Sequence, residues 1–173
     1  SLWSAADWQR EVFGDTRIEH VLAATVAGSD SRAALEAAAR NAGATSVEFG
    51  AATAAMAGVR NAYAEPSLLG VDRWLAVIGA YHRAHEACCV VDVGTAATLD
   101  TVDGSGQHLG GFIVPGPRMM IRSLHAGTNN LAAYTAASPA GGAELFADNT
   151  RDAIERGCRV AVAALVDRTC AEL

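Results

Sequence analysis

The sequence predicts an α/β fold, in which short apolar strands alternate with helices. In the first part of the chain, apolar runs at residues 20–26 and 46–49 flank a helical segment, an alternation that favours an α/β sheet. In the second part, three apolar runs separated by glycine-containing turns predict a β-meander. Apolar residues make up 51% of the chain and charged residues 18%, so the composition is globular and supplies enough apolar material for a core.

Local signals assign the elements of the first part. Four elements are expected, at residues 1–12 (helix), 20–26 (buried strand), 30–40 (helix) and 46–49 (strand). Asp30 and Ser31 are expected to cap the second helix, because their side chains can accept hydrogen bonds from its first N–H groups. Gly43 is expected to end that helix, and Pro66 to break the chain further on.

The second part is assigned in the same way. Six elements are expected, at residues 72–85 (helix), 88–93, 97–102 and 109–114 (strands), 118–124 and 149–169 (helices). Because a new sheet begins at the first of these strands, we place a domain boundary near residue 86. The predicted domains are therefore residues 1–86 and 87–173.

Composition excludes several functional classes. The net charge is −6 and no basic run is present, so a nucleic-acid-binding role is not expected. The chain contains no lysine, which rules out within it a Schiff-base lysine and a Walker-A lysine. The longest apolar runs are too short to span a bilayer, and none of the four cysteines forms a C-x-x-C pair. We therefore expect a cytoplasmic protein with buried, reduced cysteines and no membrane partner.

One motif suits a nucleotide phosphate. Asp92-Val-Gly-Thr-Ala-Ala-Thr-Leu-Asp100 places Gly94 and Thr95 in a turn between two strands, with a carboxylate at each end. Glycine lets backbone N–H groups approach phosphate oxygens, and the threonine hydroxyl adds a donor. The aspartates could hold a cation that offsets the phosphate charge. The alternative is a simple hairpin with glycine in its turn.

A second motif places opposite charges at the start of a helix. Gly70-Val-Asp72-Arg73 precedes Trp74, so a carboxylate and a guanidinium stand side by side there. Asp72 could take a proton from an alcohol, and Arg73 could bind a carboxylate or phosphate. The alternative is that Asp72 stabilises the helix dipole while Arg73 is solvated.

Histidine offers weaker signals. His82 and His85 lie three residues apart on the expected helix, but no third metal ligand is evident. The other three histidines, which include His108, show no metal-ligand spacing either.

Together the two motifs resemble those of type III pantothenate kinases, the Bvg accessory factor family within the actin and sugar-kinase superfamily. In that family G-x-D-R precedes the first aspartate of D-x-G-T-x-x-T-x-D by twenty residues, as Asp72 precedes Asp92 here. The resemblance runs from about residue 17 to the end. Matching flanks are Asn61-Ala-Tyr63, Gly110-Gly111, Pro115-Gly-Pro-Arg118, Ser123-Leu124, Gly127-Thr128 and Asn149-Thr150.

The resemblance implies a role for each matching residue. Asp72 matches the proton acceptor, and Asp92 matches the ligand of a monovalent cation, potassium or ammonium. Gly94 and Thr95 match the turn that contacts the ATP phosphates. The positions that match pantothenate-binding residues are Tyr63, Gly70, Val71, Asp72, Arg73 and Thr150.

The resemblance also implies a fold and a reaction. The family fold has two ribonuclease-H-like (actin-like ATPase) lobes, with mixed sheets flanked by helices, usually in a homodimer. The expected reaction is ATP-dependent phosphorylation of pantothenate, the first step of coenzyme A biosynthesis, with Mg²⁺ on the nucleotide. Two alternatives stay open. One is a non-catalytic relative that acts as an accessory factor for a transcription regulator, and the other is a different small-molecule kinase of the superfamily.

Two features of the family are not found in the sequence. The D-x-G-N-[TS] phosphate loop is absent before residue 30, where Asp15-Thr16 lacks the glycine. The glycine-rich segment that contacts adenosine would follow residue 173. We therefore expect a fold that is incomplete at both ends, and the resemblance leaves open whether this piece binds ATP by itself.

Overall fold

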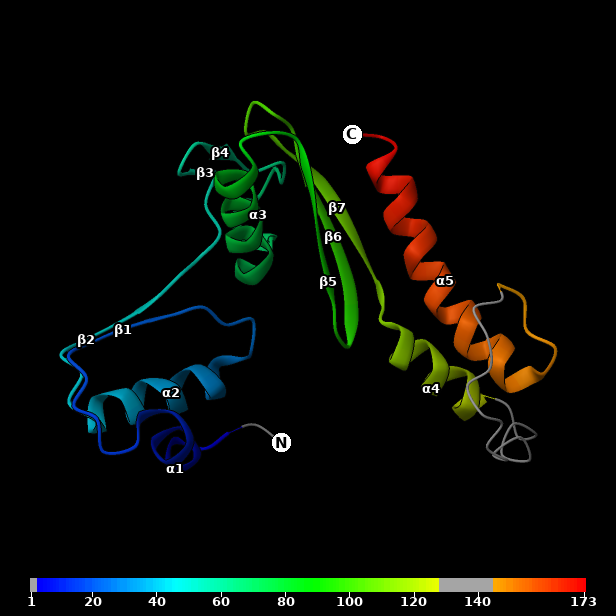
Figure 1. Ribbon diagram of the computed structural model, residues 1–173. Coiled ribbons are helices and arrows are strands. Elements are labelled where there is room, and N and C mark those ends of the chain that lie inside the picture. The colour runs from blue at the N-terminus through cyan, green and yellow to red at the C-terminus, as the bar shows by residue number, and fades with distance from the viewer. Residues whose placement is uncertain (1–2, 128–144) are drawn as a thin grey trace. The chain divides into compact units, whose positions relative to one another are not determined.

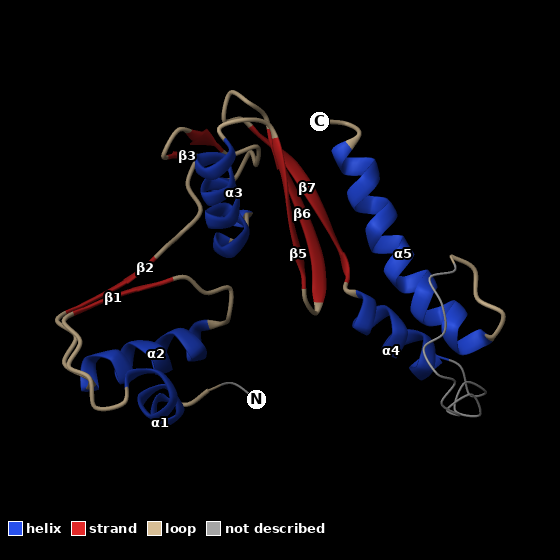
Figure 2. Ribbon diagram, viewed as in Figure 1, coloured by secondary structure: helices blue, strands red, loops and turns tan. Residues whose placement is uncertain are grey.

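The computed structural model describes residues 3–127 and 145–173, and it combines helices with small sheets (Figures 1 and 2). The α/β class expected from the sequence is confirmed. The chain divides into two compact units: unit 1 is Ser1–Met56 with Tyr63–Ala76, and unit 2 is Ala57–Ala62 with Val77–Leu173. The assignment of two ribonuclease-H-like lobes with a boundary near residue 86 stays a prediction.

Unit 1 is built around a strand–helix–strand segment. Strands β1 (His20–Ala23) and β2 (Ser46–Phe49) pair in parallel, with His20 opposite Ser46, and α2 (Ser29–Asn41) connects them. A parallel pair needs such a crossover, because its two strands start at the same edge. The chain enters this unit through α1 (Ala5–Trp8) and a π-helical turn, Gln9–Phe13. One core cluster of this unit consists of Phe13, Leu35, Ala38, Ala39 and Ala44.

Three expectations for unit 1 were wrong in detail. The first strand ends at Ala23 rather than residue 26, because the Ala27 N–H donates to Thr25 Oγ1 at 3.0 Å and turns the chain. It is not a buried strand either, since Leu22 is 82% exposed. Helix α2 has Gly28 as its N-cap and no side-chain cap, so the expected caps, Asp30 and Ser31, both lie inside its first turn.

Short elements that the sequence did not reveal precede the G-V-D-R motif. Strands β3 (Ala55–Met56) and β4 (Val59–Arg60) have two residues each, too few to show a periodicity. A 3₁₀ turn, Pro66–Leu68, precedes α3 (Val71–Ala84), with the proline in its first turn. The observed α3 confirms the helix predicted over 72–85, and it is shared between units 1 and 2.

Unit 2 contains the predicted meander. Strands β5 (Cys88–Val93), β6 (Ala96–Val102) and β7 (His108–Pro115) form an antiparallel sheet in the order β5-β6-β7 (Figure 1). The β6–β7 turn is held by Asp103, whose carboxylate accepts from the Ser105 hydroxyl and from two backbone N–H groups. These hydrogen bonds, that of the Ser105 hydroxyl above all, lower the pKa of Asp103.

Two helices follow the sheet. Helix α4 (Pro117–Gly127) packs against α5 (Thr150–Cys170), and α5 also contacts β5 and β6. Cys158 and Val162 are the buried residues of the apolar α5 face. Thr128, which belongs to one of the predicted flanks, lies outside the described residues.

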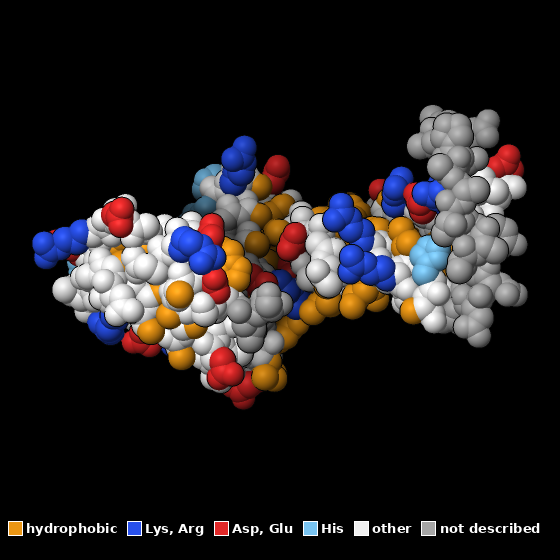
Figure 3. Space-filling view, turned by 90° about the horizontal axis from the view of Figure 1, so that it is seen from below, with side chains coloured by type: hydrophobic (Ala, Val, Ile, Leu, Met, Phe, Trp, Pro, Cys, Tyr) orange, Lys and Arg blue, Asp and Glu red, His pale blue; other side chains and the backbone are white. Residues whose placement is uncertain are grey.

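The surface retains apolar side chains (Figure 3). On β7, Phe112 and Ile113 point to opposite faces of the sheet, yet they are 51% and 61% exposed. The described residues therefore leave both faces of β7 partly uncovered.

Two further expectations concerned membrane-spanning helices and the state of the cysteines. Among the described residues, no helix is both long and apolar enough to cross a membrane. All four cysteines are free thiols, but only Cys158 is buried, and Cys170 is exposed. Burial raises the pKa of Cys89 to about 11, with a further contribution from the neighbouring Cys170 thiol.

Candidate functional site

The G-V-D-R motif begins α3, as the sequence predicted. Val71 and Trp74 are buried at 7% and 0% exposure, which fixes the first turn of the helix against the core. Asp72 lies between them on the exposed side, because neighbouring positions of a helix face different directions. The Trp74 N–H donates to Gly70 O at 2.9 Å and closes that first turn.

Three polar side chains of the motif and its flank form a group in unit 1. Arg73 Nη1 donates to the hydroxyl of Tyr63 at 3.3 Å, and the Arg73 N–H donates to Asp72 Oδ1 at 2.9 Å. Arg73 and Tyr63 are half-buried, so this contact is partly shielded from water. The structure thus brings together a carboxylate, a guanidinium and a phenol from residues ten positions apart or closer.

A side chain at position 70 would collide with the carboxylate of Asp72. A Cβ atom added to Gly70 would be 2.7 Å from Asp72 Oδ1 and 3.6 Å from Val26. Carbon–oxygen contacts below 3.0 Å are essentially absent from proteins, so the two groups could not both keep these positions. The absence of a side chain at Gly70 therefore allows Asp72 its observed orientation.

The second predicted group lies at the β5–β6 turn of unit 2. Asp92 is on β5, opposite Thr98 of β6, and the turn itself contains Gly94 and Thr95. Asp92, Gly94 and Thr95 are all exposed, as a binding turn requires. The Gly94 N–H, however, donates to Ala96 O at 2.8 Å within the turn. In the observed conformation this N–H is therefore used within the turn, and the assignment of Gly94 and Thr95 to ATP binding stays a prediction.

The segment after β7 closes against the same turn, which the sequence did not reveal. The Gly116 N–H donates to Thr95 O at 2.8 Å, and a Cβ atom on Gly116 would stand 2.1 Å from Gly94 O. Since α4 begins at Pro117, its N-terminal end lies beside the turn. That first turn carries no acidic residue, and Arg118 follows Pro117. The partial positive charge of a helix N-terminus and an arginine both favour an anion near Thr95.

Thr150 is the first residue of α5, where the sequence placed it. Its neighbour Asn149 caps the helix, with Oδ1 accepting from the Asp152 N–H at 3.0 Å. Thr150 is exposed and lines a largely apolar groove of about 660 Å³ between α4 and α5, together with Met120 and Ile154. It belongs to unit 2, whereas the other predicted pantothenate-binding residues belong to unit 1.

A buried pair in unit 2 was missed by sequence reasoning. Asp100 and His108 are 2% and 0% exposed, and His108 Nε2 lies 3.0 Å from Asp100 Oδ1. Asp100 was expected to help hold a cation beside a phosphate. The structure instead buries it against His108, so it is not at the surface where a nucleotide could approach. The one signal in the sequence was that Asp100 follows the apolar Leu99 inside a strand.

Side chains that could hold a cation are not clustered in the described part of the chain. The described residues contain no cluster of three or more His, Cys, Asp or Glu side chains that could hold a metal ion. Asp92 offers one exposed carboxylate, which fits a hard monovalent or divalent cation as a single ligand among others. The residues present thus fit part of a cation shell.

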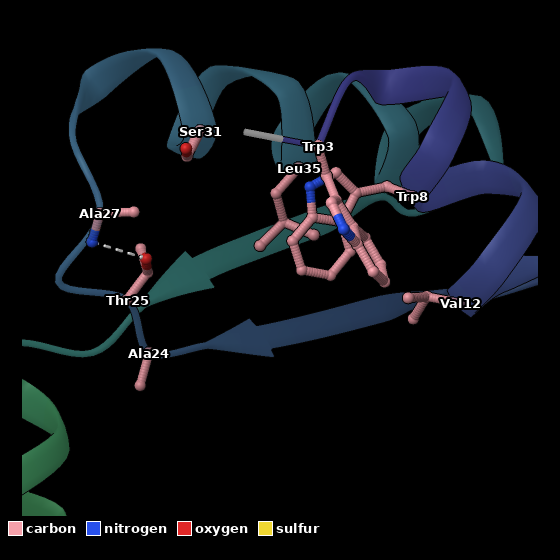
Figure 4. Close-up of a pocket in the computed structure, with 8 residues that line it drawn as sticks. All are labelled: Trp3, Trp8, Val12, Ala24, Thr25, Ala27, Ser31 and Leu35. Carbon is pink, nitrogen blue, oxygen red and sulfur yellow. Dashed lines mark hydrogen bonds between the residues drawn. The ribbon is translucent and has the colours of Figure 1, made fainter. Parts of the chain in front are cut away.

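Unit 1 also contains an apolar pocket of about 430 Å³ (Figure 4). Trp3 and Trp8 meet edge to face in it, with ring centroids 4.9 Å apart, and Leu35 of α2 lies beside them. None of the predicted site residues lines this pocket.

Comparison with known proteins decides the family. The family model described as type III pantothenate kinase matches residues 3–172, nearly the whole chain. The chain belongs to the type III pantothenate kinase family. The resemblance drawn from the two motifs is thereby confirmed.

Individual relatives agree with this assignment. A type III pantothenate kinase from Halorhodospira halophila is 49% identical over 115 residues, covering 66% of this chain and 44% of the relative. One from Aromatoleum aromaticum is 40% identical over 151 residues, covering 87% of this chain and 60% of the relative. The chain spans about half the length of the curated relatives it matches.

A solved structure is also similar. It is titled as a conserved Baf family transcriptional activator from Campylobacter jejuni, and it is 29% identical to this chain. The match covers 58% of this chain and 45% of the other, with a TM-score of 0.45, which is too low to establish a shared fold.

Proposed function

We propose that the complete protein transfers the γ-phosphoryl group of ATP to the primary hydroxyl of pantothenate, the first step of coenzyme A biosynthesis. The observation that carries this proposal is the family match over residues 3–172. The group formed by Tyr63, Asp72 and Arg73 supports it, since it supplies a base and a cation at the start of one helix.

On the acceptor side, Asp72 takes the proton of the pantothenate hydroxyl as its oxygen attacks the γ-phosphorus and the bond to ADP breaks. Arg73 binds an anionic group of the substrate, because a guanidinium matches a carboxylate in shape and charge. Tyr63 orients Arg73 through the observed hydrogen bond. Gly70, Val71 and Thr150 complete the pantothenate contacts.

On the nucleotide side, the exposed turn of Gly94 and Thr95 contacts the ATP phosphates, with the Thr95 hydroxyl as a donor. Asp92 is a ligand of potassium or ammonium, and Mg²⁺ accompanies the nucleotide. These cations would supply positive charge against the phosphates, and the 173 residues of this chain contain no lysine that could do so. We further propose two ribonuclease-H-like lobes, a homodimer and a cytoplasmic location.

The test is a coupled assay of ADP release by the complete protein with Mg²⁺, ATP and pantothenate, in potassium or in sodium. Turnover that needs both pantothenate and potassium is the expected result. A folded protein that releases no ADP with pantothenate would contradict the proposal and favour the accessory-factor alternative. ADP release with another alcohol in place of pantothenate would favour a different small-molecule kinase.

Asp92→Asn is expected to raise the potassium concentration needed for half-maximal activation about tenfold. The reason is that an amide oxygen carries less negative charge than a carboxylate oxygen and so binds a cation more weakly. Potassium titrations of ADP release would measure this. Asp167→Asn, an exposed change on α5, is the matched control and should titrate like wild type. Identical potassium curves for both variants would remove Asp92 from the cation site.

Gly70→Ala is expected to lower kcat about tenfold or more, because the new Cβ displaces the Asp72 carboxylate from its observed position. Steady-state kinetics and a thermal melt would be measured together. Gly79→Ala, in the helix that follows Gly70 and with no atom within 4 Å of its added Cβ, should leave kcat unchanged. An unchanged kcat in Gly70→Ala would show that Asp72 does not need this orientation.

A further inference from the structure

We infer that His108, held by Asp100, is a positioning residue for the pantothenate site and acts through the peptide N–H of Ala62. This inference rests on the proposed function. Tyr63, which belongs to that site, directly follows Ala62 in the chain.

The two ring nitrogens of His108 have distinct partners in unit 2. The Ala62 N–H donates to Nδ1 at 3.4 Å, and a backbone N–H can only donate, so Nδ1 is the acceptor. Nε2 therefore carries the proton and donates to Asp100 Oδ1 at 3.0 Å. The carboxylate thus fixes the tautomer that accepts from Ala62.

The same segment is bound to the β6–β7 turn at a second place. The Arg60 N–H donates to Gly106 O at 2.8 Å, and Arg60 Nε donates to Gln107 Oε1 at 3.1 Å. In the opposite direction, Gln107 Nε2 donates to Arg60 O at 3.4 Å. Residues 60–62 are therefore attached to the turn through both main chain and side chains, and His108 adds a further hydrogen bond at Ala62.

The attached segment leads directly to the proposed pantothenate site. Tyr63 follows Ala62 by one peptide bond, and its hydroxyl accepts from Arg73. A shift of the Ala62 peptide therefore moves the backbone of Tyr63.

The chemistry of the pair favours a positioning role over a packing role. Burying a carboxylate and an imidazole costs more than burying apolar side chains of similar size, unless their hydrogen bonds are satisfied. An apolar pair would fill the same volume but could not accept from the Ala62 N–H. The His108–Asp100 pair therefore provides a hydrogen-bond acceptor for the Ala62 N–H, which an apolar pair could not provide.

Two double variants of the complete protein test this inference. Asp100→Asn/His108→Leu removes the acceptor of the Ala62 N–H and replaces the buried carboxylate with a neutral amide. Asp100→Asn/His108→Asn keeps an amide oxygen that can accept from the Ala62 N–H. For the Leu variant, we expect the KM for pantothenate to rise about tenfold, with kcat and the KM for ATP within about twofold of wild type. The Asn variant should recover a KM within about threefold of wild type.

A purely structural role predicts a different pattern. It would lower kcat in both variants, by reducing the folded fraction, and would leave the KM for pantothenate unchanged. Amide hydrogen exchange gives an independent readout, since the Ala62 N–H should exchange faster in the Leu variant than in the Asn variant. Equal KM values and equal exchange in the two variants would overturn the inference.

If neither double variant folds, Arg60→Ala tests the inference instead, because Arg60 is exposed and its side chain attaches the same segment to the β6–β7 turn. It should raise the KM for pantothenate about threefold, whereas Arg83→Ala, an exposed arginine on α3, should not. An unchanged KM in Arg60→Ala would then overturn the inference.

Wild-type protein without pantothenate-dependent ADP release would overturn the proposed function itself. Normal wild-type turnover with unaltered variants overturns the positioning role alone.

Discussion

Asp72→Asn is expected to lower kcat for pantothenate phosphorylation about a thousandfold, while the fold stays intact. The amide cannot take the proton of the attacking hydroxyl, and a positioned general base contributes about a hundredfold to ten-thousandfold to a rate. Asp72 is exposed and its amide analogue can still accept from the Arg73 N–H, so little stability should be lost. Single-turnover and steady-state ADP release by the complete protein would measure the loss.

The matched control for this variant is Asp30→Asn. Asp30 also lies in the first turn of a helix, α2, and is exposed, but it has no place in the proposed site. If Asp72 only stabilises the dipole of α3, both variants should lose about 0.3–1 kcal/mol of stability and keep normal turnover. Near-normal turnover in Asp72→Asn would remove this residue from the catalytic role.

Gly116→Ala is expected to destabilise the complete protein by about 2 kcal/mol and to raise the KM for ATP. The added Cβ would stand 2.1 Å from Gly94 O and 2.9 Å from Thr95 O, so the main chain of one segment must move. Overpacking of this kind costs about 1–3 kcal/mol. Because the displaced atoms belong to the proposed phosphate turn, nucleotide binding should weaken as well. Denaturant unfolding and ATP titration would measure the two effects.

Gly157→Ala is the matched control for that change. Gly157 lies inside α5, is exposed, and has nothing within 4 Å of an added Cβ. Alanine is a better helix former, so this variant should gain about 0.5–1 kcal/mol of stability and keep its affinity for ATP. Equal stability of Gly116→Ala and wild type would show that the turn can move to accommodate the added Cβ without losing stability.

The sequence by itself determined much of the local structure. Strand β2, strand β5 and helix α3 were predicted within one residue at each end, because their apolar spacing and their flanking turn residues are local signals. The start of α3 was predicted together with the place of Asp72 at that start. The family followed from the order and spacing of two motifs.

Only the tertiary structure decided which distant groups meet. The contact of His108 with Asp100 follows from the register of β6 and β7, and its contact with Ala62 joins residues 46 positions apart. The closure of Gly116 on the Gly94–Thr95 turn likewise depends on where β7 ends. Such contacts depend on strand pairing and packing between segments distant in sequence, and no window of local periodicity contains that information.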